Sequence, residues 1–281
     1  MARLSKQRRQ LNFRARRLTG FARTLPDFLI IGAQKCGTTS LYAHLVQHPG
    51  VSPAFAKEVR YFNDHFENGV NWYKAHFPTI QYVNMMTRRL GQPLITGEGE
   101  PSYLPNPVVP QRVLDLIPEV KLIVMLRNPV SRAYSHYQHR FTRQRETRTF
   151  EDVVQADKEK LQDGFDGMPA GDGKGLGHLH YSYLPRGIYV NQLRNWMAVF
   201  PNEQFLVIRA EDFFADTQAI FDNVLAFLGL SEHHLEETNR RNVGKYTEPM
   251  SAAMQRDLAD YFRPHNQRLN EYLGRDFAWD T

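Results

Sequence analysis

The sequence predicts an α/β protein, a single domain in which a central parallel β-sheet is flanked by helices. Three short apolar runs carry this prediction, at residues 28–31, 122–126 and 205–208. Strands buried in a parallel sheet are typically continuous apolar runs of this length. Each run is followed by a helical pattern, and strands that alternate with helices are typical of βαβ units.

The segments after the three runs predict helices in a regular order. The first run is followed by a glycine-containing turn and a helix that ends before Pro49. The second run ends at Arg127, and a helix begins at about Val130. The third run leads into a helix that continues through Phe227, and residues 251–273 are expected to form a further amphipathic helix.

The composition is that of an ordinary globular protein. Of 281 residues, 42% are hydrophobic and 23% are charged, which excludes a disordered tail, a collagen-like fibre and a disulfide-rich scaffold. The single cysteine, Cys36, cannot form an intramolecular disulfide, so a reducing, cytoplasmic location is expected. No apolar run approaches the roughly 20 residues of a membrane-spanning helix, so we expect a soluble protein with no transmembrane segment.

Positive charge is concentrated at the N-terminus. Residues 1–26 contain eight Lys and Arg and no Asp or Glu, so a net charge of +5 for the chain leaves −3 for the rest. This asymmetry predicts a basic arm over residues 1–25 and one domain over residues 26–281. The arm is expected to make peripheral contact with an anionic surface, a nucleic acid or an acidic partner, unless it is simply a solvated terminus.

The strongest chemical signal is the segment between the first strand and its helix, residues 32–41, called here the anion loop. A strand, a glycine turn and a helix N-terminus place several backbone N–H groups around one point, which favours an anion. The residues expected to contact the anion are Lys35, Cys36, Gly37, Thr38, Thr39 and Ser40. The alternative is a helix cap in which the glycines are present by chance.

The anion loop differs from the loop of nucleoside triphosphatases. Their pattern, G-x-x-x-x-G-K-[ST], places a lysine directly after the second glycine. In this sequence that position is Thr38, and the lysine lies two residues before Gly37. The second and third strands are followed by Arg127 and Arg209, not by an acidic residue that would hold magnesium. A nucleotide kinase or ATPase is therefore disfavoured.

From Lys35 to Leu41 the sequence resembles the 5′-phosphosulfate loop of sulfotransferases that use 3′-phosphoadenosine 5′-phosphosulfate (PAPS). Residues 121–137 also resemble this family, in which an arginine at the strand end and a serine eight residues later bind the 3′-phosphate. The resemblance implies these roles for Arg127 and Ser135, which lie about two helical turns apart. It implies a soluble, bacterial-like member of the glycosaminoglycan or carbohydrate type, with a P-loop-like fold and PAPS as co-substrate, without a metal.

The acceptor side of the resemblance is carried by residues 57–62, which are similar to the Lys-Glu-x-His-Phe-Phe segment of glycosaminoglycan-type members. This similarity implies that Glu58 is the general base, while Arg60 replaces the family's histidine. Lys35 is the other catalytic residue expected, because its charge would neutralise the charge that builds on the leaving phosphate and the transferred group. The alternative is that Lys57 and Glu58 form an exposed charged pair. Residues 97–103 resemble the second acceptor-side strand and turn, and a carboxylate there is the other candidate base.

The resemblance extends to two further segments and to the acceptor. It implies that Gly187 lets the backbone approach the nucleotide and that a loop with Gly244 and Lys245 closes over it. The reaction it implies is transfer of a sulfuryl group to a hydroxyl or amine, for which a carbohydrate is one candidate acceptor. Residues 163–177 contain six glycines, and we expect a surface loop that helps to shape the acceptor site.

Two other functions remain open on the sequence. One is a nucleotide kinase with an altered loop, and the other is a non-enzymatic module that binds anionic ligands or nucleic acid through the basic arm. The paired histidines at residues 178–180 and 233–234 have no cysteines or carboxylates at metal-ligand spacing, so no metal site is expected.

Overall fold

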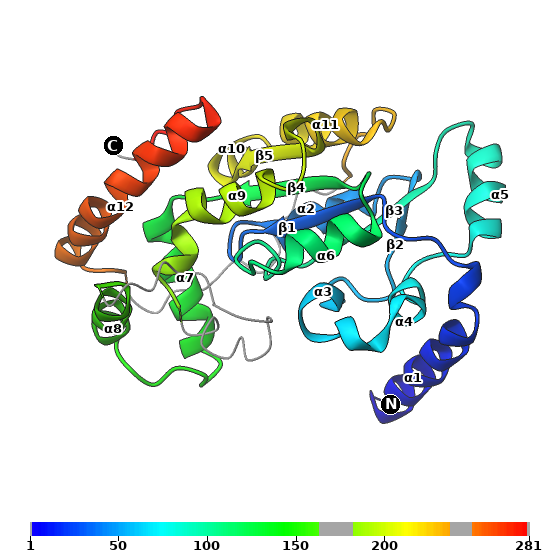
Figure 1. The fold of residues 1–281 in the computed structure, drawn as a ribbon, viewed down its shortest axis with the longest axis horizontal. Helices are drawn as coiled ribbons and strands as arrows, with labels where there is room; N and C mark the ends of the chain where they lie inside the picture. The colour runs from blue at the N-terminus through cyan, green and yellow to red at the C-terminus, as the bar shows by residue number, and fades with distance from the viewer. Residues whose placement is uncertain (1, 163–181, 237–248, 280–281) are drawn as a thin grey trace.

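The computed structural model describes residues 2–162, 182–236 and 249–279. Within them the predicted α/β fold is confirmed, because five parallel strands form one sheet with helices around it (Figure 1). The strands are β1 (Phe28–Gly32), β2 (Val51–Pro53), β3 (Ile95–Gly99), β4 (Lys121–Leu126) and β5 (Phe205–Arg209). Their order across the sheet is β2-β3-β1-β4-β5, so the first strand lies at the centre.

The three apolar runs form β1, β4 and β5, as predicted. The apolar pattern did not indicate β2 or β3. Strand β2 has only three residues, and β3 has the sequence ITGEG, in which a single residue is strongly apolar. Both strands are defined by pairing, because β2 pairs with β3 and β3 pairs with the buried central strand β1.

Helices cover the sheet. The α-helices of the described residues are α1 (Ala2–Leu18), α2 (Thr38–Leu45), α3 (Tyr61–Asp64), α4 (Val70–Lys74), α5 (Ile80–Leu90), α6 (Val109–Leu116), α7 (Pro129–Phe141), α8 (Phe150–Gln162), α9 (Tyr189–Met197), α10 (Ala210–Ala215), α11 (Thr217–Leu228) and α12 (Ala252–Leu273). Helix α2 packs on β1 and β3, and α10 and α11 pack on β5. Helices α6 and α9 cross in front of the strands in Figure 1, and strands β1, β3 and β4 are buried, while the edge strands β2 and β5 are partly exposed.

The predicted helices after β4 and at the C-terminus are confirmed, and the one after β5 is divided. Helix α7 begins at Pro129, and α12 follows Ser251, whose side chain accepts a hydrogen bond from the N–H of Met254. The helix expected to continue through Phe227 is broken at Asp216 into α10 and α11. The Asp216 side chain accepts from the third residue after it and so caps the second helix.

All five strands run in the same direction, so their carboxyl ends share one edge of the sheet. In this register Gly32 of β1 lies opposite Val124 of β4, and Leu126 lies opposite Arg209 of β5. The anion loop follows β1 at this edge, and the loops after β2 and β3 carry carboxylates to it. Open parallel sheets bind their ligands in the crevice outside the carboxyl ends of the strands.

The basic arm forms helix α1, which packs against the body of the protein. The ring centroid of Phe13 lies 4.5 Å from that of His76 and 5.4 Å from that of Phe55. Arg16 donates two hydrogen bonds, of 2.6 and 2.7 Å, to backbone carbonyls of the segment after α4. One face of the arm is therefore docked.

Some predictions concern residues that lie outside those described. These are the glycine-rich segment 163–177 and the nucleotide-closing loop with Gly244 and Lys245, which stay predictions. In the described ranges, no helix combines the length and the apolar character that crossing a membrane requires.

Candidate active site

The anion loop turns sharply between β1 and α2. The backbone N–H of Ala33 donates to the carbonyl of Met125 at 2.7 Å, which ties the start of the loop to β4. Lys35 and Gly37 have φ of 72° and 94°, in the left-handed region. Glycine suits the second of these positions because a Cβ there would also lie 3.0 Å from the ring of Phe214. Helix α2 then begins, and the N–H groups of Ser40 and Leu41 donate to the carbonyl of Gly37 at 2.9 and 3.0 Å, which fixes the first turn of the helix on the loop.

Lys35 and Arg127 lie together although 92 residues separate them. Nη1 of Arg127 donates to the carbonyl oxygen of Lys35 at 3.4 Å. Burial lowers the pKa of Lys35, and the charges of Arg127 and Arg143 lower it further. An anion bound among these cations would oppose that shift, because it stabilises the charged amine. The two segments predicted to bind the phosphates therefore form one cationic site.

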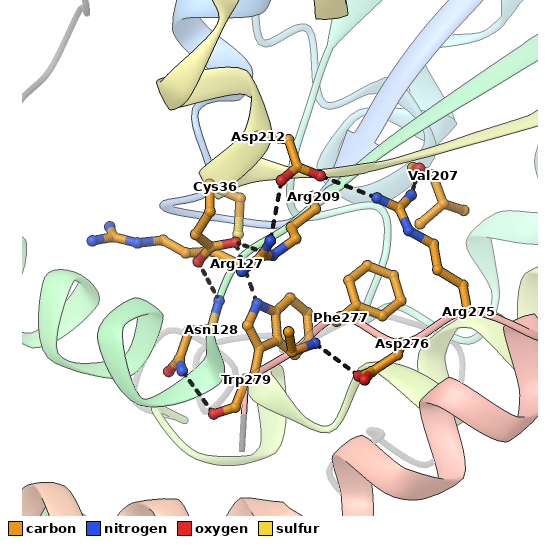
Figure 2. A network of polar contacts seen from close by, with 12 residues as sticks. Cys36, Arg127, Asn128, Val207, Arg209, Asp212, Arg275, Asp276, Phe277 and Trp279 are labelled. Carbon is orange, nitrogen blue, oxygen red and sulfur yellow. Dashed lines mark hydrogen bonds and ion pairs between the residues drawn. The ribbon is translucent and has the colours of Figure 1, made fainter. Parts of the chain in front are cut away.

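A network of polar contacts fixes the backbone that carries Arg127 (Figure 2). The hydroxyl of Tyr189 donates to the Arg127 carbonyl at 2.8 Å, and the N–H of Asn128 donates to Glu211 at 2.8 Å. Trp279 closes the network: its Nε1 donates to Glu211 at 3.3 Å, and its carbonyl accepts from Asn128 at 3.4 Å. The guanidinium of Arg127 points away from these contacts in Figure 2, so the network holds its main chain and leaves its charged end outside.

The other residues predicted to bind the donor lie close to this edge. Ser135 is on the buried face of α7 and is 4% exposed. Thr38 and Ser40 are buried in α2, and Thr39 beside them is half-buried. Cys36 is fully buried, and burial raises the pKa of its thiol to about 11, so the thiol is neutral and fills the loop.

Gly187 has a packing role. A Cβ at this position would lie 2.9 Å from the ring of Phe262 in α12 and 3.0 Å from Pro129 in α7. The glycine therefore allows the segment before α9 to approach two helices closely. Its contact with the nucleotide stays a prediction.

Two buried arginines at the site were not predicted. Arg132 in α7 is 0% exposed, and Arg186, directly before Gly187, is 4% exposed. Nε and Nη1 of Arg132 and Nε of Arg186 have no hydrogen-bond partner among the residues that the structure describes. Burial lowers the pKa of Arg186 to about 9, and its Nη1 donates to the side chain of Gln34 in the anion loop at 2.8 Å. Buried guanidinium groups with unused donors suit an anionic ligand, because an unpaired buried charge is unfavourable.

A sequence signal for these arginines was present. Both lie in segments that resemble the family, residues 121–137 and 186–189, but only the residues with an implied role were selected there. Arginines are rarely buried completely, so nothing in the sequence indicated that these two side chains point inward.

Glu58 lies in the loop after β2, and its side chain is 43% exposed. It pairs with Lys57 at 3.1 Å, as in the alternative interpretation of this segment. Two hydrogen bonds hold the loop against β3. The N–H of Gly99 donates to the carbonyl of Lys57 at 3.2 Å, and the N–H of Val59 donates to Oε2 of Glu98 at 3.0 Å. The structure thus combines an accessible carboxylate with a fixed main chain.

Glu98 is fully buried and accepts three hydrogen bonds. Besides the Val59 contact, its Oε1 accepts from the hydroxyl groups of Tyr73 and Tyr103 at 2.7 and 3.0 Å. Burial raises the pKa of this carboxyl group to about 8 in spite of these bonds. A group with no exposed surface and three partners can hold the loop, but it cannot reach a substrate.

Glu100 connects the carboxylate side of the site to the cationic side. It is 2% exposed, it accepts from the N–H and hydroxyl of Ser102 at 3.0 and 2.5 Å, and it lies 3.5 Å from Nε of Arg60. Burial raises the pKa of Glu100, and the charge of Glu58 raises it further. The charge of Glu100 in turn raises the pKa of Arg186. The two sides therefore influence each other electrostatically.

This arrangement can bind an anion beside a group that accepts a proton. The cations follow β1 and β4, and the carboxylates follow β2 and β3 at the same edge. Among the described residues, no group of three or more His, Cys, Asp or Glu side chains could hold a metal ion.

Several proteins of known class are similar in sequence. The sulfotransferase kil1 of Dictyostelium discoideum, described as membrane-associated, is 26% identical over 92% of this chain and 67% of its own length. Human bifunctional heparan sulfate N-deacetylase/N-sulfotransferase 3 is 31% identical over 89% of this chain, which spans only 30% of that enzyme. Human heparan sulfate glucosamine 3-O-sulfotransferase 3B1 is 29% identical over 92% of this chain and 66% of its own length.

A structural comparison and a family model give the same class as these relatives. The crystal structure of a sulfotransferase from Alicyclobacillus acidocaldarius superposes with a TM-score of 0.69 at 28% identity, over 92% of this chain and 100% of that one. Residues 25–263 match the family of the sulfotransferase domain. The match covers most of the chain, so the chain belongs to the sulfotransferase domain family and is an enzyme of that class.

Proposed function

We propose that this sulfotransferase transfers the sulfuryl group of PAPS to a hydroxyl or amine of a carbohydrate and leaves adenosine 3′,5′-bisphosphate. The acceptor class is supported by two relatives whose names specify N- and 3-O-sulfation of heparan sulfate. The observation that carries the donor is the contact of Arg127 with Lys35 at 3.4 Å, beside the buried guanidinium groups of Arg132 and Arg186.

The donor is held at two points in this proposal. Lys35 and the loop residues Cys36 to Ser40 hold the 5′-phosphosulfate through backbone N–H groups, hydroxyls and one ammonium charge. Arg127 and Ser135 hold the 3′-phosphate. The unused donors of Arg132 and Arg186 add positive potential behind both groups.

In this proposal the donor site also includes Gly187, Gly244 and Lys245. Only the resemblance to the family supports their contact with the nucleotide.

Catalysis needs one base and one stabilising cation. Glu58 accepts the proton of the acceptor as the new bond to sulfur forms and the bond between sulfur and the phosphate oxygen breaks. Lys35 stabilises the negative charge that develops on the departing phosphate. Glu58 is the best placed of the three carboxylates, because Glu98 and Glu100 are 0% and 2% exposed.

The neighbouring carboxylates then have supporting roles. Glu98 holds the Glu58 loop through the N–H of Val59, and Tyr73 and Tyr103 hold Glu98. Its effect on turnover is therefore that of a positioning residue.

The surroundings of the enzyme form a separate part of the proposal. The basic arm makes peripheral contact with an anionic surface, supported by its eight positive charges and the absence of acidic residues from 1–26. A cytoplasmic location is supported by the single cysteine, which is buried and unpaired.

Calorimetric titration tests the donor. Adenosine 3′,5′-bisphosphate is expected to bind, and ATP with magnesium and single-stranded RNA are expected to bind far more weakly. The nucleotide at 100 times its dissociation constant should also add about 2.7 kcal/mol to the free energy of unfolding. Tight binding of magnesium ATP, without binding of adenosine 3′,5′-bisphosphate, would favour the nucleotide kinase, which the family match does not support. Binding of RNA alone would favour a non-enzymatic binding module.

A further inference from the structure

Two acid-free segments make one side of this molecule strongly positive. Residues 1–26 contain eight basic residues, and residues 68–97 contain Lys74, Arg88 and Arg89. Neither segment contains an Asp or Glu, and the whole chain is only +5, so the remaining residues carry a net −6. The first segment contains α1 and the second contains α4, which carries Lys74, and α5, and helices α1 and α5 lie along the same side of the molecule, opposite α12 (Figure 1).

The same two segments expose large apolar side chains. Most of the strongly exposed ones in the described residues belong to them: Leu11 (63%), Leu18 (80%), Phe21 (73%), Ile80 (46%), Tyr82 (43%) and Met85 (55%). Helix α5 has no buried residue, and a shallow surface groove runs along it, lined by apolar side chains, by the polar Thr79, Gln81 and Asn84, and by Arg88 and Arg89. Large apolar side chains gathered on one exposed surface mark an interaction site.

The exposed apolar side chains of α1 do not belong to the face that packs against the rest of the protein. The docked face carries Phe13 and Arg16, which are half-buried, while Leu11 and Leu18 lie on the far side of the same helix. Arg8, Arg14 and Arg17 are exposed as well. The helix therefore has one face for the protein and a second, apolar and basic, face for a partner.

The segment after α1 is tied to the start of α5. Arg23 forms an isolated antiparallel bridge with Thr79, and the N–H of Thr24 donates to the carbonyl of Pro78 at 3.1 Å. The end of the arm is thus fixed beside the start of α5. Phe21 precedes Arg23 by two residues, and Ile80 directly follows Thr79.

We infer that the α1–α5 surface, made of the exposed apolar and basic residues of these two helices, docks on an anionic lipid bilayer. The inference rests on the proposed contact of the arm with an anionic surface and names that surface. Arginines at the surface are attracted to anionic headgroups, and apolar side chains enter the boundary between headgroups and acyl chains. A water-soluble polyanion would use the arginines alone and would leave Leu, Ile, Phe and Met side chains in water.

Co-sedimentation of the full chain with vesicles tests this surface. The vesicles are phosphatidylcholine alone, or phosphatidylcholine with about one-third phosphatidylserine. Heparin affinity at the same ionic strength reports on polyanion binding. The apolar variant is Leu18→Gln/Ile80→Gln/Met85→Gln, the charge variant is Arg88→Gln/Arg89→Gln, and the control is Tyr272→Gln, an exposed aromatic on α12 (37%).

The wild type and Tyr272→Gln should bind the anionic vesicles, and added salt should weaken that binding. The apolar variant should lose about tenfold or more in vesicle partitioning while its heparin affinity stays unchanged. The charge variant should lose about fivefold per arginine on vesicles. Sulfuryl transfer to a small acceptor should be normal in all variants, so the result does not depend on the catalytic proposal.

Unchanged vesicle binding by the apolar variant would overturn the inference. Heparin binding without vesicle binding would also overturn it and would leave the proposed anionic contact of the arm standing. Equal binding to vesicles with and without phosphatidylserine would show that lipid charge is not recognised and would overturn docking on an anionic bilayer. Binding to neither vesicles nor heparin would refute both the bilayer docking and the proposed anionic contact of the arm.

Discussion

The donor side and the acceptor side of this site meet at one edge of the sheet but differ in construction. The donor side, built on β1 and β4, consists of a glycine-containing loop and arginines that follow a strand. The acceptor side, built on β2 and β3, consists of carboxylates held by tyrosines and backbone N–H groups from separate segments. The loop and Arg127 on the donor side directly follow apolar strands, so a local pattern locates them, whereas no apolar run precedes the carboxylates of the acceptor side.

Their electrostatics are opposite and complementary. Burial lowers the pKa of Lys35 and Arg186 on the donor side and raises the pKa of Glu98 and Glu100 on the acceptor side. In each case burial disfavours the charged form. A bound anionic donor would stabilise the charged forms of Lys35 and Arg186. The buried carboxyl groups of Glu98 and Glu100 need no charged ligand. In the proposed function, donor binding would therefore complete the electrostatics of the donor side, whereas Glu98 and Glu100 already have partners within the protein.

The largest expected effect separates chemistry from binding. Glu58→Gln should lower kcat by roughly 10²–10⁴ while donor affinity is unchanged, because the amide keeps the shape but cannot accept the proton. Turnover is measured with labelled donor at saturation. Glu100→Gln, directly after β3, is the matched control. If it loses turnover and Glu58→Gln does not, the base belongs to residues 97–103.

On the donor side the expected effect is on affinity. Arg127→Ala should weaken the binding of adenosine 3′,5′-bisphosphate by about 10- to 150-fold, the value of a charge-assisted phosphate contact. The rate at saturating donor should change less. Arg145→Ala, an exposed arginine shortly after α7, serves as the control in calorimetry. Equal affinities for the two variants would place the 3′-phosphate elsewhere.

The same difference explains what the sequence could predict. The anion loop and Arg127 lie directly after apolar strands, so the pattern located both the strands and the residues at their ends. Strands β2 and β3 were missed as patterns because the first is three residues long and the second contains two glycines. The resemblance to a family, and not periodicity, indicated Glu58.

Other features of the site follow from tertiary structure only. The burial of Arg132 and Arg186 depends on how α7 and the segment before α9 pack, which no local spacing encodes. Tyr73, a partner of Glu98, comes from α4, a five-residue helix without a sequence signal. The docking of the arm through Phe13 could not be predicted, since its charge indicated contact with an anionic partner or a solvated terminus and gave no sign of packing on the domain.

The pH dependence of stability tests the acceptor side next. Glu98 has a pKa of about 8 in the folded chain against an ordinary value of 4.5, so the folded state holds more protons between these values. Its contribution to stability is therefore full below pH 4.5 and is lost as the pH rises through about 8. The slope is at most about 1.4 kcal/mol per pH unit.

Glu98→Gln should make this slope smaller in urea denaturation series across that window. Glu203→Gln, which removes an exposed carboxylate, should leave it unchanged. A wild-type slope in the Glu98 variant would mean that this carboxyl group titrates normally, and the contrast between the two sides would lose its electrostatic basis.

The smallest expected effect concerns the arm, which packs on Phe55 after β2 and on His76 after α4. Phe13→Ala removes a half-buried ring that packs on Phe55 at 5.4 Å, three residues before Glu58. The loss should be about 1–2 kcal/mol in the free energy of unfolding, less than the 3–5 kcal/mol of a fully buried Phe. Leu11→Ala, on the outer face of α1, should change stability by less than about 0.5 kcal/mol.

A modest rise in the KM for a small acceptor should accompany Phe13→Ala, with donor affinity unchanged, because Phe55 leads into the loop that carries Glu58 and lies away from the anion loop. Removal of residues 1–23 should have the same selective effect and leave most of kcat. If truncation instead weakened donor binding and acceptor use equally, the arm would support the whole sheet edge, and the two sides of the site could not be treated as separately built.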